Sequence, residues 1–432
     1  MLGEIIKRFK GSEFIKNSFI LTFGTLIAQI LPLIFYPILG RIYSPSEFGV
    51  LATITAITPI LTILASGMYE GAILVAKSKV EAANIIGLII TRSILVLGIF
   101  SVLFAAYSKE ISEIIKDPNI DKWLFVSPIA AFAMVVYSCF NEWCVTYKYF
   151  FSLSINKIIN TSSIAIGKTL FGFFNLFGNG LVMGDLFGKS ISGLTCIYGA
   201  FKFDRDYFFN IRFRKFRKLA KKYINFPKFL MTDQILNNIG GSLHIFFIGA
   251  YFDNSELGYV SMSMTLLTVP VTVISSAIKD VFRQKASREF IETGNCRSLF
   301  MKILKPLIIF TLIFFTILYF FLPNIFVLAL GNQWAKSGLY SQILIPMFIS
   351  NFISMSLGGV LIISNKIKVS LYWQLYTIVT SSIAFLIGIY LYDDIEITIF
   401  LFMIARTISY ILYGVLSYYY AKENRKNTFE FK

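Results

Sequence analysis

The sequence predicts an all-α integral membrane protein with twelve transmembrane helices, arranged as two parallel six-helix lobes around a central cavity. Three observations predict this fold: an apolar composition, apolar runs of membrane-spanning length along the whole chain, and a repeated motif that divides these runs into two sets of six. Of the 432 residues, 56% are hydrophobic and 15% are charged, against roughly 25% charged in an ordinary soluble domain. A soluble fold of this length would have too few polar residues to cover its surface.

A transmembrane helix needs about 20 mostly apolar residues. The predicted spans cover residues 17–40, 47–69, 83–107, 123–147, 155–176, 179–200, 229–251, 257–278, 303–322, 341–363, 370–391 and 397–420. The first run follows Lys7, Arg8, Lys10 and Lys16, as in a signal peptide. However, it is too long for a signal-peptide core and lacks a small-residue cleavage site, so we expect a retained helix.

Basic residues are unequally divided between the two alternating sets of loops. Of the 40 Lys and Arg residues, 31 fall at the termini, in one set of loops or in the first residues of the spans that follow these loops, and five fall in the other set. Cytoplasmic loops are enriched in Lys and Arg, so the sequence predicts a multi-pass protein with both termini in the cytoplasm. The basic run within residues 201–228 is then a cytoplasmic linker that also attracts anionic lipid headgroups. No nucleic-acid partner is expected.

A short motif occurs once in each half of the chain. Residues 43–49 read YSPSEFG and residues 252–258 read FDNSELG, so an offset of 209 places Gly49 on Gly258. Parallel repeats of this kind form a cavity between them in transporters. The expected domains are an N-terminal lobe, a basic linker, a C-terminal lobe and a tail, at residues 1–200, 201–228, 229–422 and 423–432.

The run from Arg41 to Gly49, its counterpart ending at Gly258, the twelve spans and the basic linker resemble the polysaccharide transporter branch of the MOP flippase superfamily. Within that branch the chain is most similar to Wzx-type O-antigen flippases. The resemblance implies alternating-access transport of undecaprenyl-diphosphate-linked oligosaccharides from the inner to the outer leaflet of the bacterial plasma (inner) membrane. It implies a lipid-linked oligosaccharide as substrate, contact with membrane lipids, and a downstream polymerase and chain-length machinery as partners in O-antigen (lipopolysaccharide) or capsule synthesis.

Cations inside the spans are the candidate contacts for a diphosphate headgroup. Ionisable groups at bilayer depth are costly and normally face a cavity or a partner. Lys168 lies deepest in its span, and Arg92, Lys189 and Arg406 are also within predicted spans. Arg92 and Arg406 are close enough to a cytoplasmic end to extend to the interface instead. Arg41, at the outer mouth of the first span, either guides the headgroup or caps its own helix.

The acidic and titratable residues of the spans have two interpretations each. Asp185 is four residues before Lys189 on one helical face, so the two side chains can pair. Glu142 is either a structural partner for a cation or a proton carrier. His244 is the chain's one histidine, and it is either a packing residue or a proton-coupling group, because its ordinary pKa is near neutrality.

Gly180, Gly184 and Gly188 form a smooth stripe along the sixth span. Small residues at this spacing let another helix approach closely, so the stripe predicts close helix packing. A further expectation is that helices slide or bend on this surface.

The sequence contains no nucleophile with its base and no Cys/His cluster of metal-binding spacing. We therefore expect no enzyme activity, no cofactor and no metal. The alternatives are a multidrug or cation antiporter of the same superfamily, which predicts acidic cavity residues, or a membrane polysaccharide polymerase. A polymerase tends to need a sizeable outer loop, and the predicted outer loops are short.

Overall fold

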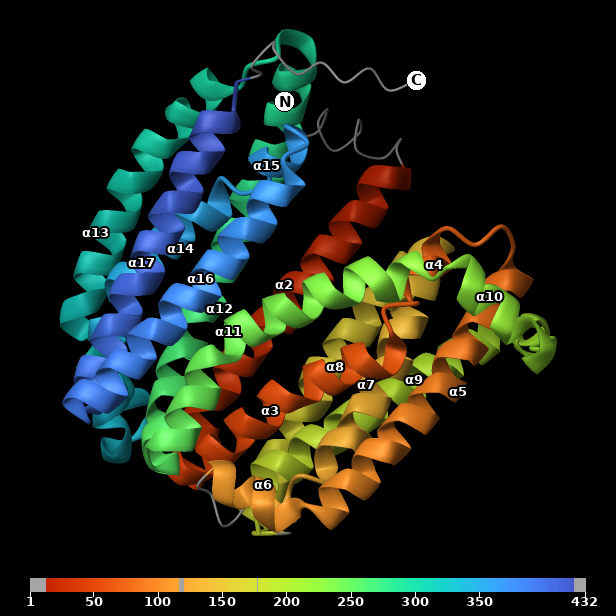
Figure 1. Cartoon of the computed structure of the whole chain (residues 1–432), viewed down its shortest axis with the longest axis horizontal. Helices are drawn as coiled ribbons and strands as arrows, with labels where there is room; N and C mark the ends of the chain where they lie inside the picture. Colours follow the sequence, from red (N-terminus) through yellow and green to blue (C-terminus); the bar gives the residue numbers. More distant parts are fainter. Residues whose placement is uncertain (1–12, 116–119, 177, 423–432) are drawn as a thin grey trace. The chain divides into compact units, whose positions relative to one another are not determined.

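The computed structural model describes residues 13–115, 120–176 and 178–422 (Figure 1). Within them the chain is helical with short turns, contains no β-strand, and has one isolated bridge between Asn295 and Lys422. The prediction of an all-α fold is confirmed. The predicted cytoplasmic tail at residues 423–432 and the basic N-terminus up to Lys10 lie outside the described residues.

Nine helical segments in the described ranges are long and apolar enough to cross a membrane. They are Ile20–Ile42, Pro45–Ser66, Lys79–Ala106, Val126–Thr146, Asn254–Thr293, Arg297–Leu330, Asn332–Ile363, Lys368–Tyr392 and Ile395–Tyr420. The remaining three predicted spans fall on α8 (Phe150–Phe173), α9 (Gly180–Phe209) and α11 (Met231–Tyr251). These helices carry charged side chains such as Lys168 and Asp185, so the exact number of twelve crossings stays a prediction.

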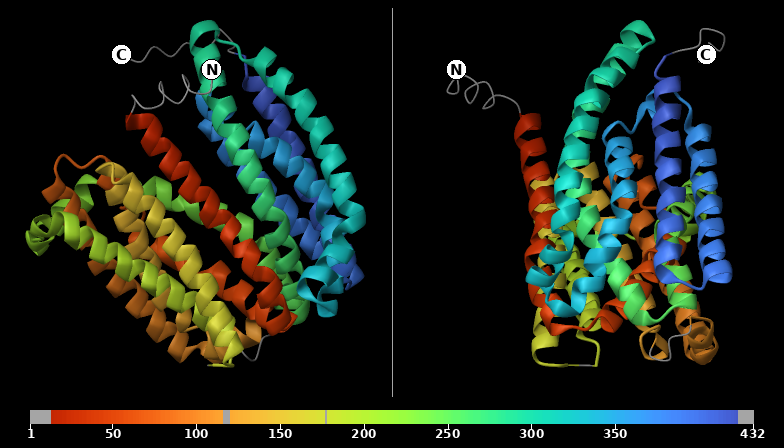
Figure 2. Two further views of the ribbon diagram at one scale, coloured as in Figure 1. Left: turned by 180° about the vertical axis from the view of Figure 1, so that it is seen from behind. Right: turned by 90° about the vertical axis from the view of Figure 1, so that its left-hand side faces the viewer.

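Residues 1–258 form a first compact unit. Its core is built by α3 (Pro45–Ser66), α5 (Lys79–Ala106) and α7 (Val126–Thr146), whose interface buries Ile85, Ile86 and Trp143. On another side of the same unit, α8 packs against both α2 (Glu13–Ile42) and α9, as the views from behind and from the side show (Figure 2). Helix α11, which the sequence predicts to open the C-terminal lobe, packs against α3. The predicted lobe boundaries at residues 200 and 229 stay a prediction.

The basic linker is attached to the first unit. It folds into a 3-10 turn (Phe213–Lys215), helix α10 (Phe216–Lys222) and a π-helical turn (Phe226–Leu230). Leu219 and Tyr223 are buried in the core that contains Trp143. The Tyr69 hydroxyl donates to the carbonyl of Ala220 at 3.2 Å. The linker therefore presents its basic face to solvent while its apolar face is held by the first unit.

Residues 259–432 form a second compact unit. It contains most of α12 (Asn254–Thr293), then α13 (Arg297–Leu330), α14 (Ala335–Ser356), α16 (Ile367–Ile387) and α17 (Ile395–Tyr420). Helices α12 and α13 have 40 and 34 residues, which is about 60 and 51 Å of helix against a hydrocarbon core of about 30 Å. Both helices extend beyond the spans predicted at 257–278 and 303–322, and the part of each helix that crosses the membrane stays a prediction.

The end of α17 is fastened to the start of α13. The Cys296 amide donates to the carbonyl of Ala421 at 2.8 Å. Arg297 donates from Nε to the carbonyl of Tyr418 at 3.1 Å and from Nη2 to that of Tyr419 at 2.9 Å. These bonds satisfy carbonyls that the helix end leaves without partners, and they fix the Arg297 guanidinium in place.

Candidate functional site

The first unit contains a buried cluster of two lysines and one aspartate. Lys189 Nζ lies 2.6 Å from one carboxylate oxygen of Asp185, and Lys168 Nζ lies 3.2 Å from the other. The predicted pairing of Asp185 with Lys189 on one face of α9 is therefore present, and Lys168 of α8 joins it. The side chain of Asp185 exposes 7% of its surface, that of Lys189 exposes 12% and that of Lys168 exposes 14%.

Glycines bring α8 and α9 close enough for this contact. A β-carbon added to Gly184 would lie 2.6 Å from the carbonyl carbon of Gly167, and one added to Gly167 would lie 2.9 Å from the carbonyl oxygen of Gly184. The Tyr43 hydroxyl lies beside Gly180 of α9 and also holds the α8 backbone, because it donates to the carbonyl of Lys168 at 2.6 Å. The glycine stripe thus packs the helices closely, as predicted, and it does so at the depth of the cluster.

The cluster has an unbalanced charge. Asp185 carries one negative charge and accepts hydrogen bonds from two ammonium groups, which leaves one positive charge in a largely buried setting. Burial removes the water that would solvate this charge, so an anion that reaches it gains a strong interaction. Each lysine keeps a small exposed surface, and a phosphate oxygen can approach there without breaking the ion pair.

The predicted turn after the first span is built on a capping box. The Ser44 hydroxyl accepts from the Glu47 amide at 3.4 Å, and the Glu47 carboxylate accepts from the Ser44 amide at 2.9 Å. Asn179, the residue that caps α9, donates to the carbonyl of Glu47 at 3.3 Å. Arg41 is exposed on the last turn of α2. The turn therefore joins α2, α3 and α9 at one end of the unit.

The two copies of the repeated motif contact each other reciprocally. A β-carbon on Gly49 would lie 3.0 Å from the carbonyl carbon of Asn254, and a β-carbon on Gly258 would lie 2.6 Å from that of Pro45. Under the offset of 209, Pro45 corresponds to Asn254 and Gly49 to Gly258. In a contact across a two-fold axis, residue i meets j and j meets i. The geometry at this point is what a parallel repeat predicts.

Arg92 lies apart from the lysine cluster in its described contacts. Its Nη1 atom donates to the carbonyls of Leu64 at 2.7 Å and Ala65 at 2.5 Å, so it caps the end of α3. Glu70 follows on the next turn and accepts from the Ser66 hydroxyl at 3.1 Å. Its second carboxylate oxygen is buried and has no partner among the described residues. Burial raises the pKa of Glu70, and the nearby charge of Glu142 raises it further. Hydrogen bonds from its own backbone amide and from Ser66, and the charge of Arg92, lower the pKa but do not offset the rise.

The remaining predicted residues are on α11 and α17. His244 is buried on α11. Arg406 lies on α17 in the second unit, where Nη2 donates to the Tyr410 hydroxyl at 2.9 Å and the guanidinium is 5.2 Å from the centre of that ring. Its Nε atom is buried without a partner in the described part of the chain.

A second buried aspartate lies in the predicted linker and was not among the predicted site residues. Asp204 lies at a kink of α9 and is 2.7 Å from Lys79 Nζ. It also accepts from Trp143 Nε1 and the Tyr149 hydroxyl, both at 3.0 Å. A signal was present, because Asp204 and Asp206 are the two acidic residues in a run of ten cations. Lys157 was missed as well: it is three turns before Lys168 on α8 and donates to the Thr25 hydroxyl at 3.0 Å.

Residues 38–338 match the model of a family described as "Polysaccharide biosynthesis protein". The chain belongs to this polysaccharide biosynthesis family. The match confirms the resemblance found from the turn at Arg41–Gly49 and the two-halved organisation. No curated protein matches the chain.

Several solved structures of the MOP superfamily share the fold of this polysaccharide biosynthesis protein. The lipid II flippase MurJ in an inward closed conformation has a TM-score of 0.75 at 14% identity, over 92% of this chain and 87% of that one. An inward-facing multidrug resistance MATE family transporter has 0.73 at 14% identity, over 90% and 93%. A MOP superfamily transporter from Pyrococcus furiosus has 0.60 at 14% identity, over 93% and 94%. The chain is thus a multi-pass membrane protein with a transporter fold.

Proposed function

We propose that this chain is a flippase that moves undecaprenyl-diphosphate-linked oligosaccharide repeat units from the inner to the outer leaflet of the bacterial plasma membrane by alternating access. Its substrate is of the O-antigen or capsule type, and both termini are cytoplasmic. The family match and the shared fold support a transporter over an enzyme. The observation that carries the choice of substrate class is the buried cluster of Lys168, Asp185 and Lys189, with its one unmatched positive charge.

The cluster has the chemistry to bind a diphosphate reversibly. In the ground state Asp185 holds both ammonium groups in place. A phosphate oxygen at Lys168 or Lys189 supplies the missing negative charge, and Asp185 retains the other lysine when the phosphate leaves. An inside-negative potential of about 100 mV favours outward movement of about two negative charges by roughly 4 to 5 kcal/mol. No ATPase is needed for this step.

The test compares lipid-linked intermediates and their leaflet in cells with and without the gene. We expect a completed undecaprenyl-diphosphate repeat unit to accumulate on the cytoplasmic leaflet of the deletion strain, and wild-type protein to restore its export. Lys168→Arg should restore most of it and Lys168→Ala little. The matched control is Lys109→Ala, because Lys109 is an exposed lysine in the predicted outer loop between the third and fourth spans. Unchanged lipid intermediates in the deletion strain would refute the function, and full activity of Lys168→Ala would refute the site.

A cation antiporter is the second candidate, and one observation favours it. Glu70 has a buried unpartnered oxygen and feels the charge of Glu142, as a proton- or cation-exchanging site would. This candidate predicts drug sensitivity of the deletion strain with normal glycan intermediates. It also predicts that Glu70→Gln, and not Lys168→Ala, abolishes transport.

A further inference from the structure

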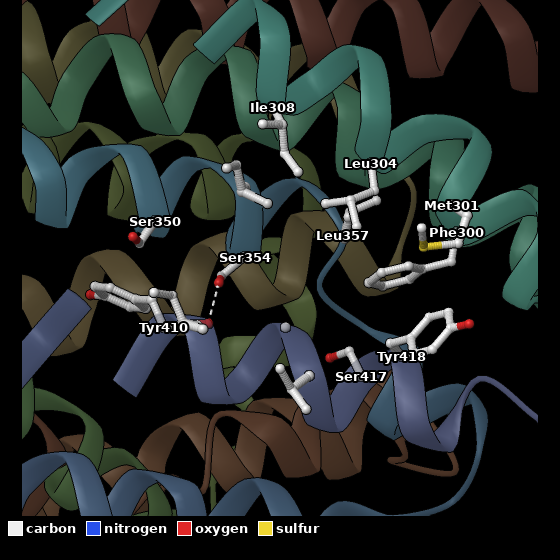
Figure 3. A pocket seen from close by; sticks show the side chains of 14 residues that line it. Phe300, Met301, Leu304, Ile308, Ser350, Ser354, Leu357, Tyr410, Ser417 and Tyr418 are labelled. Atoms are coloured by element: carbon white, nitrogen blue, oxygen red, sulfur yellow. Dashed lines mark hydrogen bonds between the residues drawn. The ribbon is translucent and has the colours of Figure 1, made fainter. Parts of the chain in front are cut away.

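The second unit contains an apolar slot of about 360 Å³ between α13, α14 and α17 (Figure 3). Its walls include Phe300, Leu304, Ile308, Ile353, Leu357 and Val415. Two of the three serines in the wall direct their hydroxyls to the backbone: Ser354 donates to the carbonyl of Tyr410 at 2.7 Å and Ser350 to that of Pro346 at 3.1 Å. The hydroxyl of the third, Ser417, is buried and has no partner among the described residues. The slot therefore offers a hydrocarbon surface to a ligand.

The slot runs along the helices. At one end the rings of Phe300 and Tyr418 are 5.8 Å apart, and the lining continues to Ile308 on α13 and Tyr410 on α17. Eight residues of helix span about 12 Å. The shape is that of a channel for a single hydrocarbon chain, parallel to the helices that cross the bilayer.

The slot also opens sideways. Ile411 and Val415 line it and expose 56% and 58% of their surface. On membrane-spanning helices such exposed apolar side chains face lipid. A chain can therefore enter from the bilayer without passing through the protein.

The end of the slot near Phe300 is positively charged. Arg297 lies one turn before Met301 on the slot-lining face of α13, and its guanidinium is fixed by the carbonyls of Tyr418 and Tyr419. Helix α13 contains no acidic residue over Arg297–Leu330. Lys302 is exposed on the other face of α13 and does not line the slot. A chain in the slot thus has the cation of Arg297 at its polar end.

We propose that the slot binds one acyl chain of an anionic phospholipid of the cytoplasmic leaflet, with the phosphate headgroup at Arg297. The leaflet rests on the orientation proposed above. The order of features along the slot, a cation and then about 12 Å of apolar wall, is the order of headgroup and chain in such a lipid. Because two backbone carbonyls hold Arg297 in place, this site fits a resident lipid better than a headgroup that must leave for the other leaflet.

Lipid retention by the purified full-length protein tests the proposal. The protein is reconstituted in vesicles of phosphatidylethanolamine and phosphatidylglycerol, re-extracted in mild detergent and analysed by native mass spectrometry. We expect the wild type to retain one phosphatidylglycerol. Gly414 lines the slot, and a β-carbon added there meets no atom within 4 Å, so Gly414→Phe should fill the slot and abolish retention. Gly414→Leu is the smaller variant if Gly414→Phe unfolds. Ile404→Phe, about three turns away on the exposed face of α17, is the matched control.

The headgroup is tested separately. A cation near an anionic surface contributes an affinity factor of about fivefold, so Arg297→Gln should weaken phosphatidylglycerol retention by about that factor. Lys302→Ala, at an exposed lysine on the other face of α13, should leave it unchanged, and so should Lys285→Ala, at another exposed lysine of the second unit. Retention that mirrors the bulk lipid mixture, equal retention by Gly414→Phe, or retention of a polyprenyl phosphate from cell membranes in place of a phospholipid would each overturn the proposal. Loss of translocation in Lys168→Ala bears on the flippase function and not on this site.

Discussion

At the scale of single residues, Asp185 determines whether the lysine cluster can stay buried. Its carboxylate is shared by Lys168 and Lys189, so a neutral side chain would leave two ammonium groups with little water and no counter-ion. Breaking a buried ion pair by removing one partner is strongly destabilising, whereas an apolar replacement of the whole pair is often tolerated. The aspartate therefore has a structural role in addition to its effect on the charge of the site.

We predict that Asp185→Asn lowers the free energy of unfolding by about 3 kcal/mol, measured by thermal unfolding of the protein in detergent. The double variant Asp185→Asn with Lys189→Met should recover part of this loss, because it removes one of the two unpaired charges. The two single variants and the double variant form a cycle that isolates the interaction. Equal stability of Asp185→Asn and the wild type would contradict the cluster geometry.

Glu70 makes the stability of the protein fall as pH rises, whereas an ordinary salt-bridged acid makes stability rise with pH. Burial raises its pKa in the folded state above the ordinary value of a glutamate, 4.5. The folded state then binds more protons than the unfolded state above pH 4.5, so stability falls as pH rises through the folded pKa and the loss is complete above it.

We predict that Glu70→Gln is more stable than the wild type at pH 8 and that this advantage shrinks toward pH 5, measured by unfolding in detergent across this range. Glu110→Gln, at an exposed glutamate of α6 (Ser108–Ile115), should show no such trend. A wild type whose stability relative to Glu70→Gln rises with pH would show that Glu70 is stabilised as a carboxylate.

At the scale of elements, the contact between α8 and α9 positions both lysines. We predict that Gly184→Ala destabilises the protein by about 1 to 3 kcal/mol, because its β-carbon would meet the α8 backbone and the helices would have to separate. On the same helix, Gly199 has no atom within 4 Å of an added β-carbon. Gly199→Ala should therefore be neutral or slightly stabilising, since alanine favours the helix.

Thermal unfolding of Gly184→Ala and Gly199→Ala in the same detergent tests this prediction. If both substitutions shift the midpoint of thermal unfolding equally, close packing at Gly184 is not the cause. Transport should follow stability in Gly184→Ala, because a wider spacing also moves Lys168 away from Asp185.

The sequence predicted part of this site and not the rest, for a physical reason. The pair Asp185–Lys189 is local, four residues apart on one helix, so helical periodicity reveals it. Lys168 was identified by its depth in an apolar run, but its partner could not be found, because contacts between helices depend on packing. Arg92 was predicted only as a cation within a span, and its use as a cap for α3 depends on where another helix ends. Asp204 was assigned to a linker, since its partners Lys79 and Trp143 are more than 60 residues away.

At the scale of the whole molecule, the positions of the long apolar segments could be predicted, because hydropathy over about 20 residues reports them directly. The polar extensions of α12 and α13 and the attachment of α10 could not be predicted in the same way. The extensions continue the hydrogen-bonded helix beyond its apolar part, and α10 is held by the contacts of Leu219 and Tyr223. No long apolar run marks either feature in the sequence.

The predicted orientation can be measured with single cysteines. The four native cysteines are buried, so they should react slowly with a membrane-impermeant maleimide. We predict that Lys109→Cys is labelled in intact cells, because the positive-inside rule places its loop outside. Lys218→Cys, exposed on α10, should be labelled only after the membrane is permeabilised. The reverse pattern would invert the topology and with it the proposed direction of transport.

The reciprocal contact of Gly49 with Asn254 and of Gly258 with Pro45 makes the fold tolerant of mutation. Each half of the contact consists of a main-chain carbonyl and a missing side chain, so the contact itself requires a particular residue only at the two glycines. A substitution that keeps the backbone of the two turns leaves it intact. A chain built in this way can change most of its sequence while its helices keep crossing at the same point, and its similarity in fold to MurJ at 14% identity is what that tolerance permits.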